Sequence, residues 1–518
     1  MKILYVNAGN VGSIGLDSFL IAPPLNLMYL TPTVPEHQKF LIDLKANPKI
    51  SDDVIRRLIQ KNDLIAVSSY TPSIKSAMKI GSIAKEYDKP VVIGGYHASL
   101  LPDVVMEPMF DVSVQNEGEI TFPEIVKVLD QDGRWTPENL KGIKGVAYKN
   151  EGRLVVNEAR PLIKDLDTLP MPDRELIGNA KYEYFGASID SLESSRGCVG
   201  RCDFCCVKEH TPNWRKKTPA RVIAEIEQLY ASKTKWISFQ DSEFTINMNR
   251  TDEICKLIVD HGFENRWYSA QVRADDLMRS KKVFGHMVDA GFKMLFIGIE
   301  SVHQRTLDRI GKKISVDTIR QAIKMCHDYG VTIFGAIIIG NIGETYNDVL
   351  ATIKYANELD LDITQFTSLT PLPKTKLWEE ANQKGWIIDH DWTHYDFTRV
   401  VMRTPDLTQL QIAELVRKAY NDFYIGPYWG SYFFKKAKRF MTNRRNWWFF
   451  KMLPGFMKNI GPIQKLINDI SSPPVVDQSD TAEPAYRSKL SPTISVEQPV
   501  KLEKERAIEK SMKRQARS

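Results

Sequence analysis

Residues 194–210, SSRGCVGRCDFCCVKEH, decide how the rest of this chain is organised. They place Cys198, Cys202 and Cys205 in a Cys-x3-Cys-x2-Cys spacing. Such short spacers let three thiolates converge from one loop on a single inorganic cluster. Zinc sites and ferredoxin clusters usually have four protein ligands. Three ligands on one loop therefore predict a [4Fe–4S] cluster with one iron left open for a reacting molecule.

The remaining thiols and one histidine leave an alternative to this cluster. A zinc knuckle would need a fourth ligand, and His210, five residues after Cys205, could supply it. Cys206 directly follows the third cysteine, and neighbouring side chains do not easily face one cluster, so we interpret it as a non-ligand. Cys255 and Cys326 lie in apolar helical patterns and are expected to be small buried hydrophobes.

Bulk composition limits the class of protein. A chain of 518 residues, 43% of them hydrophobic, can bury large cores and should form two or three domains. Six cysteines, no signal peptide and a labile cluster motif predict a reducing cytoplasm. No apolar run reaches the roughly 18 residues that a membrane-spanning helix needs.

The N-terminal region alternates strand and helix patterns. Apolar, β-branched runs at residues 2–7, 64–68 and 91–93 predict strands, and residues 52–60 and 73–87 predict helices between them. This order predicts a Rossmann-like, doubly wound parallel sheet, which binds ligands at the carboxyl ends of its strands. The candidate binding residues at these ends are Ser68, Ser69, Gly94, Gly95, His97, Glu117 and Gly118.

A second α/β region follows a connector. Residues 161–174, PLIKDLDTLPMPDR, are rich in proline and aspartate and predict an extended linker. Strand candidates follow at 189–194, 236–239, 267–270, 294–297, 331–339 and 363–369, with helical patterns between them. About six βα units predict a partial TIM-type barrel, whose chemistry sits at the carboxyl ends of the strands.

Four segments follow the cysteine loop in order at these strand ends. They are an acidic cluster ending in Phe244, Arg-Ala-Asp at 273–275, Gly-x-Glu-Ser at 298–301 and Gly-x-x-x-Glu-Thr at 340–345. Together with the cysteine spacing, they resemble the radical S-adenosylmethionine (SAM) enzymes. In that family SAM binds the open iron and yields a radical that abstracts hydrogen from carbon. This step requires no general base, so we predict no catalytic side chain.

SAM carries an ammonium, a carboxylate and ribose hydroxyls, so its site needs hydrogen-bond acceptors and a fixed cation. Asp241, Glu243 and Glu300 are the expected acceptors, and Ser301 is a further expected contact. Arg273 is the expected cation.

Three loops of the first region, at residues 68–72, 94–99 and 117–119, resemble the cobalamin-binding domain that precedes many radical SAM enzymes. Residues 94–98 read GGYHA, a GGxHA loop, and residues 116–119 read NEGE where the family has GEGE. The Asp-x-His-x-x-Gly motif that supplies an axial histidine elsewhere is absent. The resemblance implies cobalamin bound base-off without that ligand. The alternative is a Rossmann-like domain that has lost the cofactor or contacts substrate instead.

The C-terminal part differs in composition. Residues 428–460 interleave aromatic residues with lysine and arginine and contain no acidic residue. This pattern predicts peripheral contact with the inner face of a membrane. The alternatives are nucleic-acid binding, which we do not expect, and a helical cap with a solvated basic face.

The predicted organisation has five parts. They are a cobalamin-binding-like domain (1–145), a linker (146–185), a radical SAM partial barrel (186–403), a basic aromatic helical extension (404–465) and a disordered tail (466–518).

The chain looks most like the subgroup with hopanoid methylases, archaeal tetraether-lipid ring synthases and the anaerobic Mg-protoporphyrin monomethyl ester cyclase. This implies modification of an unactivated carbon, most simply C-methylation, of a hydrophobic substrate such as an isoprenoid lipid or a tetrapyrrole. It also implies a reductant such as ferredoxin or flavodoxin. The alternatives are oxidative ring formation, methylation of a protein side chain, an RNA methylthiotransferase and a non-catalytic iron–sulfur protein.

Overall fold

The structure is a computed structural model that describes residues 1–9, 21–178, 180–184, 186–232 and 234–424. The described residues fall into two compact units, residues 1–9 with 27–162, and residues 21–26 with 163–424. Each unit contains one seven-stranded sheet. The predicted segment 428–460 and the predicted tail lie outside the described residues.

The first sheet has the strand order β2-β1-β3-β4-β5-β6-β7. Its strands are β1 (Lys2–Asn7), β2 (Gln38–Asp43), β3 (Leu64–Ser68), β4 (Val91–Gly94), β5 (Val112–Val114), β6 (Val146–Asn150) and β7 (Arg153–Val156). Strands β1 to β5 are parallel. All five residues of β3 are buried, as expected of a central strand covered on both faces.

The helices of this unit are α1 (Leu25–Leu30), α2 (Asp52–Lys61), α3 (Ile74–Lys85), α4 (Tyr96–Leu100), α5 (Gly118–Asp132) and α6 (Pro137–Leu140), with short 3-10 turns η2 (Thr31–Thr33), η3 (Thr71–Ser73) and η4 (Pro102–Met106). Helices α1 to α4 lie between successive parallel strands, and α5 and α6 lie between β5 and the antiparallel β6. The chain moves from β1 outward to β2 and returns to β3 on the other side of β1. With right-handed crossovers, this reversal places helices on both faces. The doubly wound prediction is confirmed.

The first unit extends further along the chain than predicted. Sequence analysis ended the domain at residue 145, whereas β6 and β7 continue its sheet as an antiparallel hairpin. Glu151 and Gly152 at the tip have φ angles of 48° and 74°. Positive φ at both central residues is the geometry of a type I′ turn, the tight turn that matches the twist of a hairpin. The hairpin was missed because its two strands are short.

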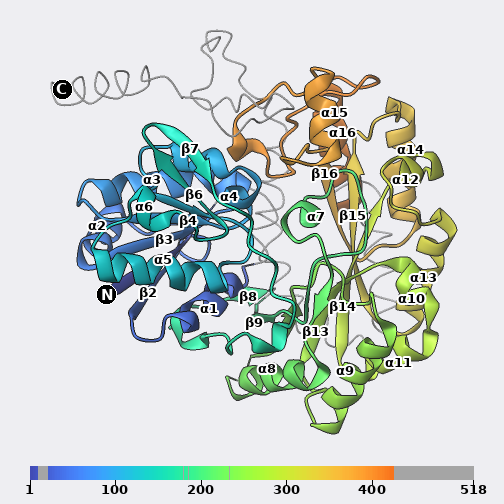
Figure 1. Cartoon of the computed structure of the whole chain (residues 1–518). Helices are drawn as coiled ribbons and strands as arrows, with labels where there is room; N and C mark the ends of the chain where they lie inside the picture. The colour runs from blue at the N-terminus through green and yellow to red at the C-terminus, as the bar shows by residue number, and fades with distance from the viewer. Residues whose placement is uncertain (10–20, 179, 185, 233, 425–518) are drawn as a thin grey trace. The chain divides into compact units, whose positions relative to one another are not determined.

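The second sheet has the order β16-β15-β14-β13-β12-β9-β8 (Figure 1). Its strands are β8 (Glu183–Tyr184), β9 (Ala187–Leu192), β12 (Trp236–Phe239), β13 (Trp267–Val272), β14 (Phe292–Glu300), β15 (Thr332–Ile339) and β16 (Ile363–Ser368). The six strands from β9 to β16 are parallel, and β8 pairs antiparallel with β9 at one edge. This confirms the predicted partial barrel of six βα units.

Helices follow the strands of the second sheet. They are α7 (Val207–His210), α8 (Pro219–Ala231), α9 (Met248–Asp260), α10 (Ala274–Arg279), α11 (Lys281–Asp289), α12 (Gln304–Arg309), α13 (Val316–Asp328), α14 (Tyr346–Glu358), α15 (Lys376–Gln383) and α16 (Gln409–Tyr424). Short 3-10 turns lie at η5 (Leu166–Thr168), η6 (Arg174–Ile177) and η7 (Trp392–His394), and β10 (Ser195–Arg196) pairs with β11 (Arg215–Lys216).

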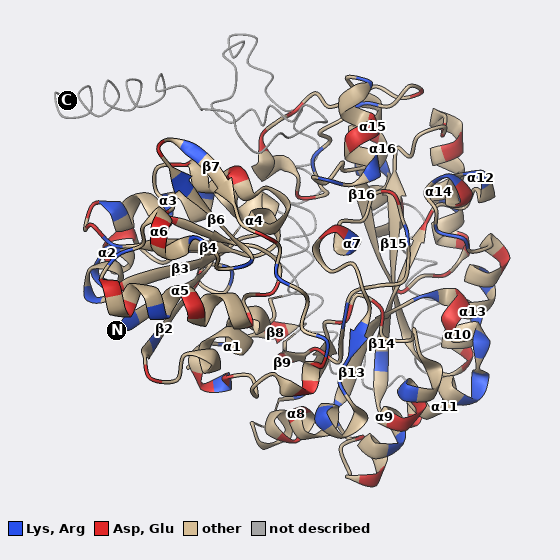
Figure 2. Ribbon diagram, viewed as in Figure 1, with Lys and Arg blue, Asp and Glu red and all other residues tan. Residues whose placement is uncertain are grey.

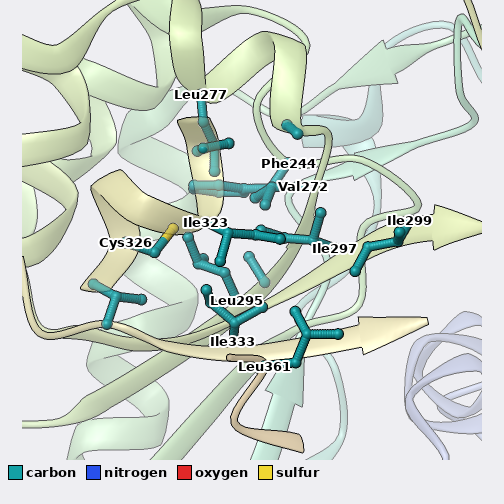
Figure 3. Packing of buried hydrophobic residues seen from close by; sticks show 14 of the residues in the cluster. Phe244, Val272, Leu277, Leu295, Ile297, Ile299, Ile323, Cys326, Ile333 and Leu361 are labelled. Atoms are coloured by element: carbon teal, nitrogen blue, oxygen red, sulfur yellow. The ribbon is translucent and has the colours of Figure 1, made fainter. Parts of the chain in front are cut away.

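The core of the second unit lies between the sheet and these helices (Figure 3). Leu295 and Ile333 from the strands share one buried cluster with Leu277 and Ile323 from the helices. Cys326 lies in the same cluster and is fully buried, as predicted. In Figure 2 most of the ribbon of both sheets is tan, and charged residues lie mainly on helices and loops. No helix among the described residues is long and apolar enough to span a membrane.

Candidate functional site

The cysteine loop leaves the carboxyl end of β9 and is closed at its base by the β10–β11 hairpin. The Lys217 amide donates to the carbonyl oxygen of Ser194 at 2.9 Å, which joins the two ends of the loop. At Gly197 the backbone has φ +86°, and an added Cβ would lie 2.5 Å from the carbonyl oxygen of Asn213. Only glycine fits this crossing point.

The far end of the loop is held by segments from the other side of the barrel. The Asp203 amide donates to the carbonyl oxygen of Ile310 at 3.1 Å, and the Leu377 amide donates to the carbonyl oxygen of Asp203 at 3.0 Å. Phe204 packs against two apolar clusters of this unit. Strand order thus brings the loops after β9, β14 and β16 together around the cysteines.

The three predicted ligands are free, partly buried thiols. Burial raises the pKa of Cys205 to about 12, so a thiolate there needs a cation beside it. Among the described residues, no three His, Cys, Asp or Glu side chains are close enough to hold one metal ion. A cubane is compatible with this finding, because its three cysteine ligands bind three separate irons and lie farther apart than the ligands of one ion.

Asp241 holds the first residues of the cysteine loop through hydrogen bonds. Its carboxylate accepts from the Ser194 amide at 2.7 Å, from the Ser194 hydroxyl at 2.6 Å and from the Ser195 hydroxyl at 2.5 Å. Arg250 of α9 donates to the Ser194 carbonyl oxygen at 2.7 Å and to the Lys217 carbonyl oxygen at 3.0 Å. Asp241 is fully buried. The structure therefore assigns Asp241 to fastening the loop, whereas sequence analysis assigned it to SAM.

Glu243 lies two residues further along and is engaged on one side only. Its Oε1 atom accepts hydrogen bonds from the amide and the hydroxyl of Thr245. Burial raises the pKa of Glu243 to about 8. A buried carboxyl group of this kind favours a cationic partner such as an ammonium. The charge of Glu243 also acts on the Cys198 thiol. The expected role of Glu243 as a hydrogen-bond acceptor for SAM remains a prediction.

Arg273 follows β13 and faces a cavity of about 250 Å³ beside the cysteine loop. It donates to both carboxylate oxygens of Asp275, at 3.0 and 3.1 Å, and to the Lys312 carbonyl oxygen at 2.9 Å. An added Cβ at Gly200 would lie 3.3 Å from the sulfur of Cys198 and 3.9 Å from Arg273 Nη1. The guanidinium therefore lies close to the predicted cluster.

Glu300 ends β14 in a left-handed conformation, φ +63°, where the pairing with β15 shifts register. Lys312 donates to its Oε1 atom at 2.6 Å, and both side chains are about 9% exposed. An added Cβ at Gly298 would lie 2.3 Å from that oxygen, so glycine leaves the space for the pair. Charges acting on the Cys202 thiol include Lys312, Glu300 and Arg273. Sequence analysis missed Lys312, because one lysine in a loop carries no periodic signal.

Ser301 has an internal partner. Its hydroxyl donates at 2.6 Å to the buried carboxylate of Glu344, which belongs to the Gly-x-x-x-Glu-Thr segment. Burial raises the pKa of Glu344, and the serine stabilises the ionised form. The structure thus assigns Ser301 to joining the loops after β14 and β15, whereas sequence analysis assigned it to SAM.

In the first unit, the predicted cobalamin residues lie at the carboxyl ends of β3, β4 and β5. Gly95 has φ +93°, and an added Cβ would lie 2.7 Å from the carbonyl oxygen of Ser69 and 3.1 Å from the hydroxyl of Ser68. Any residue larger than glycine would fill this cradle. The Gly94 carbonyl oxygen accepts from the Ser69 amide at 3.0 Å. His97 is fully buried, with Nδ1 3.4 Å from the Thr71 hydroxyl.

Burial lowers the pKa of His97 to about 3, so the ring is neutral. A ring inside the unit supports the turn after β4, and contact with a ligand at the surface would need it to move. This differs from its expected place in the cobalamin site. Two aromatic rings lie nearby: the exposed Tyr70 stacks on the half-buried Tyr96 at 5.4 Å between ring centroids, and Lys45 Nζ lies 4.9 Å above the Tyr70 ring.

The departure at Asn116 has a structural reason. Its φ is +57°, a left-handed value that asparagine tolerates nearly as well as glycine. The Ser99 hydroxyl accepts from its amide at 2.8 Å. Glu117 and Gly118 then form the N-terminal end of α5. Asparagine in place of the family's glycine therefore preserves this turn.

Two families match the chain. The Radical SAM superfamily matches residues 192–356, from the end of β9 into α14, and the B12 binding domain matches residues 14–126. The matches agree with the geometry. Three thiols, a buried carboxyl group and a guanidinium fit a cluster with SAM, and the glycine cradle fits a large cofactor lying on the first sheet.

Several relatives align over most of the chain. A methyltransferase of Pyrococcus horikoshii, PH0819, described as uncharacterized, is 35% identical over 436 residues, 82% of this chain and 93% of that protein. The anaerobic magnesium-protoporphyrin IX monomethyl ester cyclase of Rubrivivax gelatinosus is 27% identical over 451 residues, 85% of this chain and 80% of that protein.

The fold is shared with solved structures. One example is the cobalamin-dependent S-adenosylmethionine radical enzyme OxsB with aqua-cobalamin and S-adenosylmethionine bound, with a TM-score of 0.66 and 18% identity over 90% of this chain and 74% of that chain.

Proposed function

The chain belongs to the radical SAM enzymes that carry a B12-binding domain, and on this premise we propose that it methylates an unactivated carbon of a hydrophobic substrate, such as an isoprenoid lipid or a tetrapyrrole. Its cofactors are a [4Fe–4S] cluster, SAM and cobalamin. When bound, these groups supply radical hydrogen abstraction and methyl transfer, chemistry that no side chain performs.

The observation that carries the proposal is the arrangement around the cysteines. Cys198, Cys202 and Cys205 would hold three irons, and their loop is fastened at both ends before any cofactor arrives. Glu243 would accept the ammonium of SAM, and Arg273 would pair with its carboxylate. Glu243 is buried and Arg273 is half-buried, and hydrogen bonds hold both side chains in place, so they need little rearrangement on binding.

Glu300 would accept a ribose hydroxyl or the ammonium of SAM. Its Oε1 atom is already bonded to Lys312, which fixes the direction of the carboxylate and compensates its charge. The supporting residues thereby orient the binding groups, as the outer partners of metal ligands do. No step assigned to these residues requires a general base.

In the first unit, Gly94 and Gly95 would let the backbone approach cobalamin closely, and Ser68, Ser69, Glu117 and Gly118 would border it. His97 would support this edge from inside. A membrane contact through residues 428–460 would bring a hydrophobic substrate to the enzyme, and it belongs to the same proposal.

The test uses the full chain with iron, sulfide, SAM, cobalamin and dithionite. The proposal predicts both 5′-deoxyadenosine and S-adenosylhomocysteine among the products. A variant with all three loop cysteines changed to alanine should lose the cluster and both products, whereas C206A should keep them. A reconstituted chain that binds four irons and never cleaves SAM would refute the proposal.

A second function is favoured by the relationship to the Rubrivivax gelatinosus cyclase. Oxidative ring formation would consume SAM and give 5′-deoxyadenosine without S-adenosylhomocysteine. The ratio of the two products therefore separates methylation from ring formation. Comparing the lipids and pigments of a deletion strain with those of its parent would then identify the substrate.

A further inference from the structure

The mouth of the cavity beside the cysteine loop is positively charged. Of the residues that line the cavity, five are basic and two are acidic. Two of the basic residues, Arg273 and Lys312, are engaged inside the site. The other three, Arg201, Arg279 and Lys313, are exposed at its rim.

The rim charges differ in how far they are neutralised. Arg279 pairs with Asp276 at 2.8 Å. Among the described residues, neither Arg201 nor Lys313 forms an ion pair. Within the part of the chain that the structure describes, two adjacent loops therefore present positive charge without an ion-pair partner at the same opening.

The backbone conformation of one turn directs Lys312 and Lys313 to opposite sides. Gly311 and Lys313 have φ angles of +71° and +52°. Between these left-handed residues, Lys312 turns inward to Glu300, and Lys313 remains in solvent. A lysine in a left-handed conformation is uncommon, and such strain is concentrated at functional positions.

An apolar residue completes the rim. Val199 is 61% exposed and lies between Cys198 and Gly200. The next residue contacts the first predicted ligand, because the Gly200 amide donates to the Cys198 sulfur at 3.3 Å. A partner that covers Val199 would lie a single residue away from a cluster ligand. An apolar centre inside a charged rim is typical of protein–protein interfaces.

We propose that Arg201, Arg279 and Lys313, grouped around Val199, form the docking surface for an acidic one-electron carrier protein of the flavodoxin or ferredoxin kind. This inference rests on the proposed function, because a radical SAM cluster must be reduced before it can act. The docked carrier loses one electron and the cluster gains it, with no atom transferred. Positive charge at the opening steers an acidic partner to the part of the cysteine loop around Val199.

The test reverses the two free rim charges in the full chain. Arg201→Glu leaves the expected SAM residues unchanged. Lys313→Asp introduces aspartate, a residue that tolerates a left-handed φ. With reduced flavodoxin at low salt, cluster reduction measured by electron paramagnetic resonance should slow at least about tenfold in the double variant. With dithionite, which needs no docking surface, cluster reduction and SAM cleavage should match the wild type.

A matched control changes the same charge elsewhere. Lys324 and Lys354 are 74% and 81% exposed on α13 and α14. The variant Lys324→Asp/Lys354→Glu should retain the wild-type rate with flavodoxin. A second measurement needs no turnover: calorimetry of oxidised flavodoxin with the cluster-free chain should show about tenfold weaker binding for the rim variant, and wild-type binding should weaken with salt.

Several outcomes would overturn the docking surface. These are an unchanged flavodoxin rate in the rim variant, equal slowing in the control variant, or slower SAM cleavage with dithionite, which would show that the rim admits SAM instead. If wild-type protein with dithionite never cleaves SAM, the proposed function fails. The binding measurement then still decides whether the rim holds the carrier.

Discussion

The carboxyl ends of the strands carry different residue types in the two sheets. In the second unit, Asp241, Glu243, Glu300 and Glu344 bring four carboxyl groups to the strand ends, and all four residues are buried. In the first unit, the loops after β3 and β4 contain glycine and serine, a neutral buried histidine and a tyrosine pair, and Asp43 brings a buried carboxyl group to the end of β2.

The difference matches the cofactors that the two families imply. SAM is small and ionic, so its site needs charges held in fixed directions, which burial and mutual pairing provide. Cobalamin is large, so its site needs space and close backbone approach, which glycine provides. One sheet end is organised by electrostatics and the other by shape, and each of the following changes tests that contrast.

The largest effect is expected at the Glu300–Lys312 pair. Lys312→Met leaves a buried carboxylate without its cation, so the free energy of unfolding should fall by ~3–5 kcal/mol and SAM binding should weaken. Urea denaturation and calorimetry measure the two effects. Glu300→Met/Lys312→Met should recover much of the stability without recovering SAM binding. A double variant that binds SAM normally would limit the pair to a structural role.

A smaller loss is expected at Asp241. Asp241→Ala removes three short hydrogen bonds from the base of the cysteine loop, and ~2–3 kcal/mol of stability should go with them. The cluster should also lose iron to a chelator faster, and Asp241→Asn should lie between alanine and the wild type. If Asp241→Asn keeps its iron and loses SAM affinity, the carboxylate serves the cofactor after all.

Two matched glycine substitutions test the role of shape at the strand ends of the first unit. Gly95→Ala and Gly133→Ala both place alanine at positive φ, which costs about 1 kcal/mol. Only at Gly95 does the new methyl group meet neighbouring atoms, whereas nothing lies within 4 Å at Gly133. Absorbance titration should therefore show at least ~10-fold weaker cobalamin binding for Gly95→Ala alone, about 1.4 kcal/mol. The iron content of both variants should match the wild type.

The smallest effect concerns the pH dependence of SAM binding. Burial raises the pKa of Glu243 to about 8, so below pH 8 a proton must leave before the carboxylate can accept an ammonium. SAM affinity should then fall as pH decreases, by at most ~10-fold per pH unit, which corresponds to 1.36 kcal/mol. Titrations between pH 6.5 and about 9 measure this slope. Glu243→Gln should bind more weakly and lose the slope; a persisting slope would assign the proton to another group.

Much of the fold could be predicted from the sequence, because buried parallel strands are continuous apolar runs such as residues 2–7 and 331–339. The β6–β7 hairpin could not, since short strands with mixed polarity resemble a linker. Candidate site residues could be predicted because the carboxyl ends of parallel strands bring their loops together. Asp241 and Ser301 were assigned to SAM because their partners lie 47 and 43 residues away, and no local pattern reveals those partners.

The two backbone bonds of Asp203 have a consequence for how the protein is made. One reaches Ile310 and the other Leu377, so the cysteine loop receives its outer support only after the chain has been translated beyond residue 377. Until then a nascent chain on the ribosome exposes unsupported thiols. Iron delivery should therefore follow translation beyond residue 377, and ribosome-bound chains stalled before that residue should retain little iron.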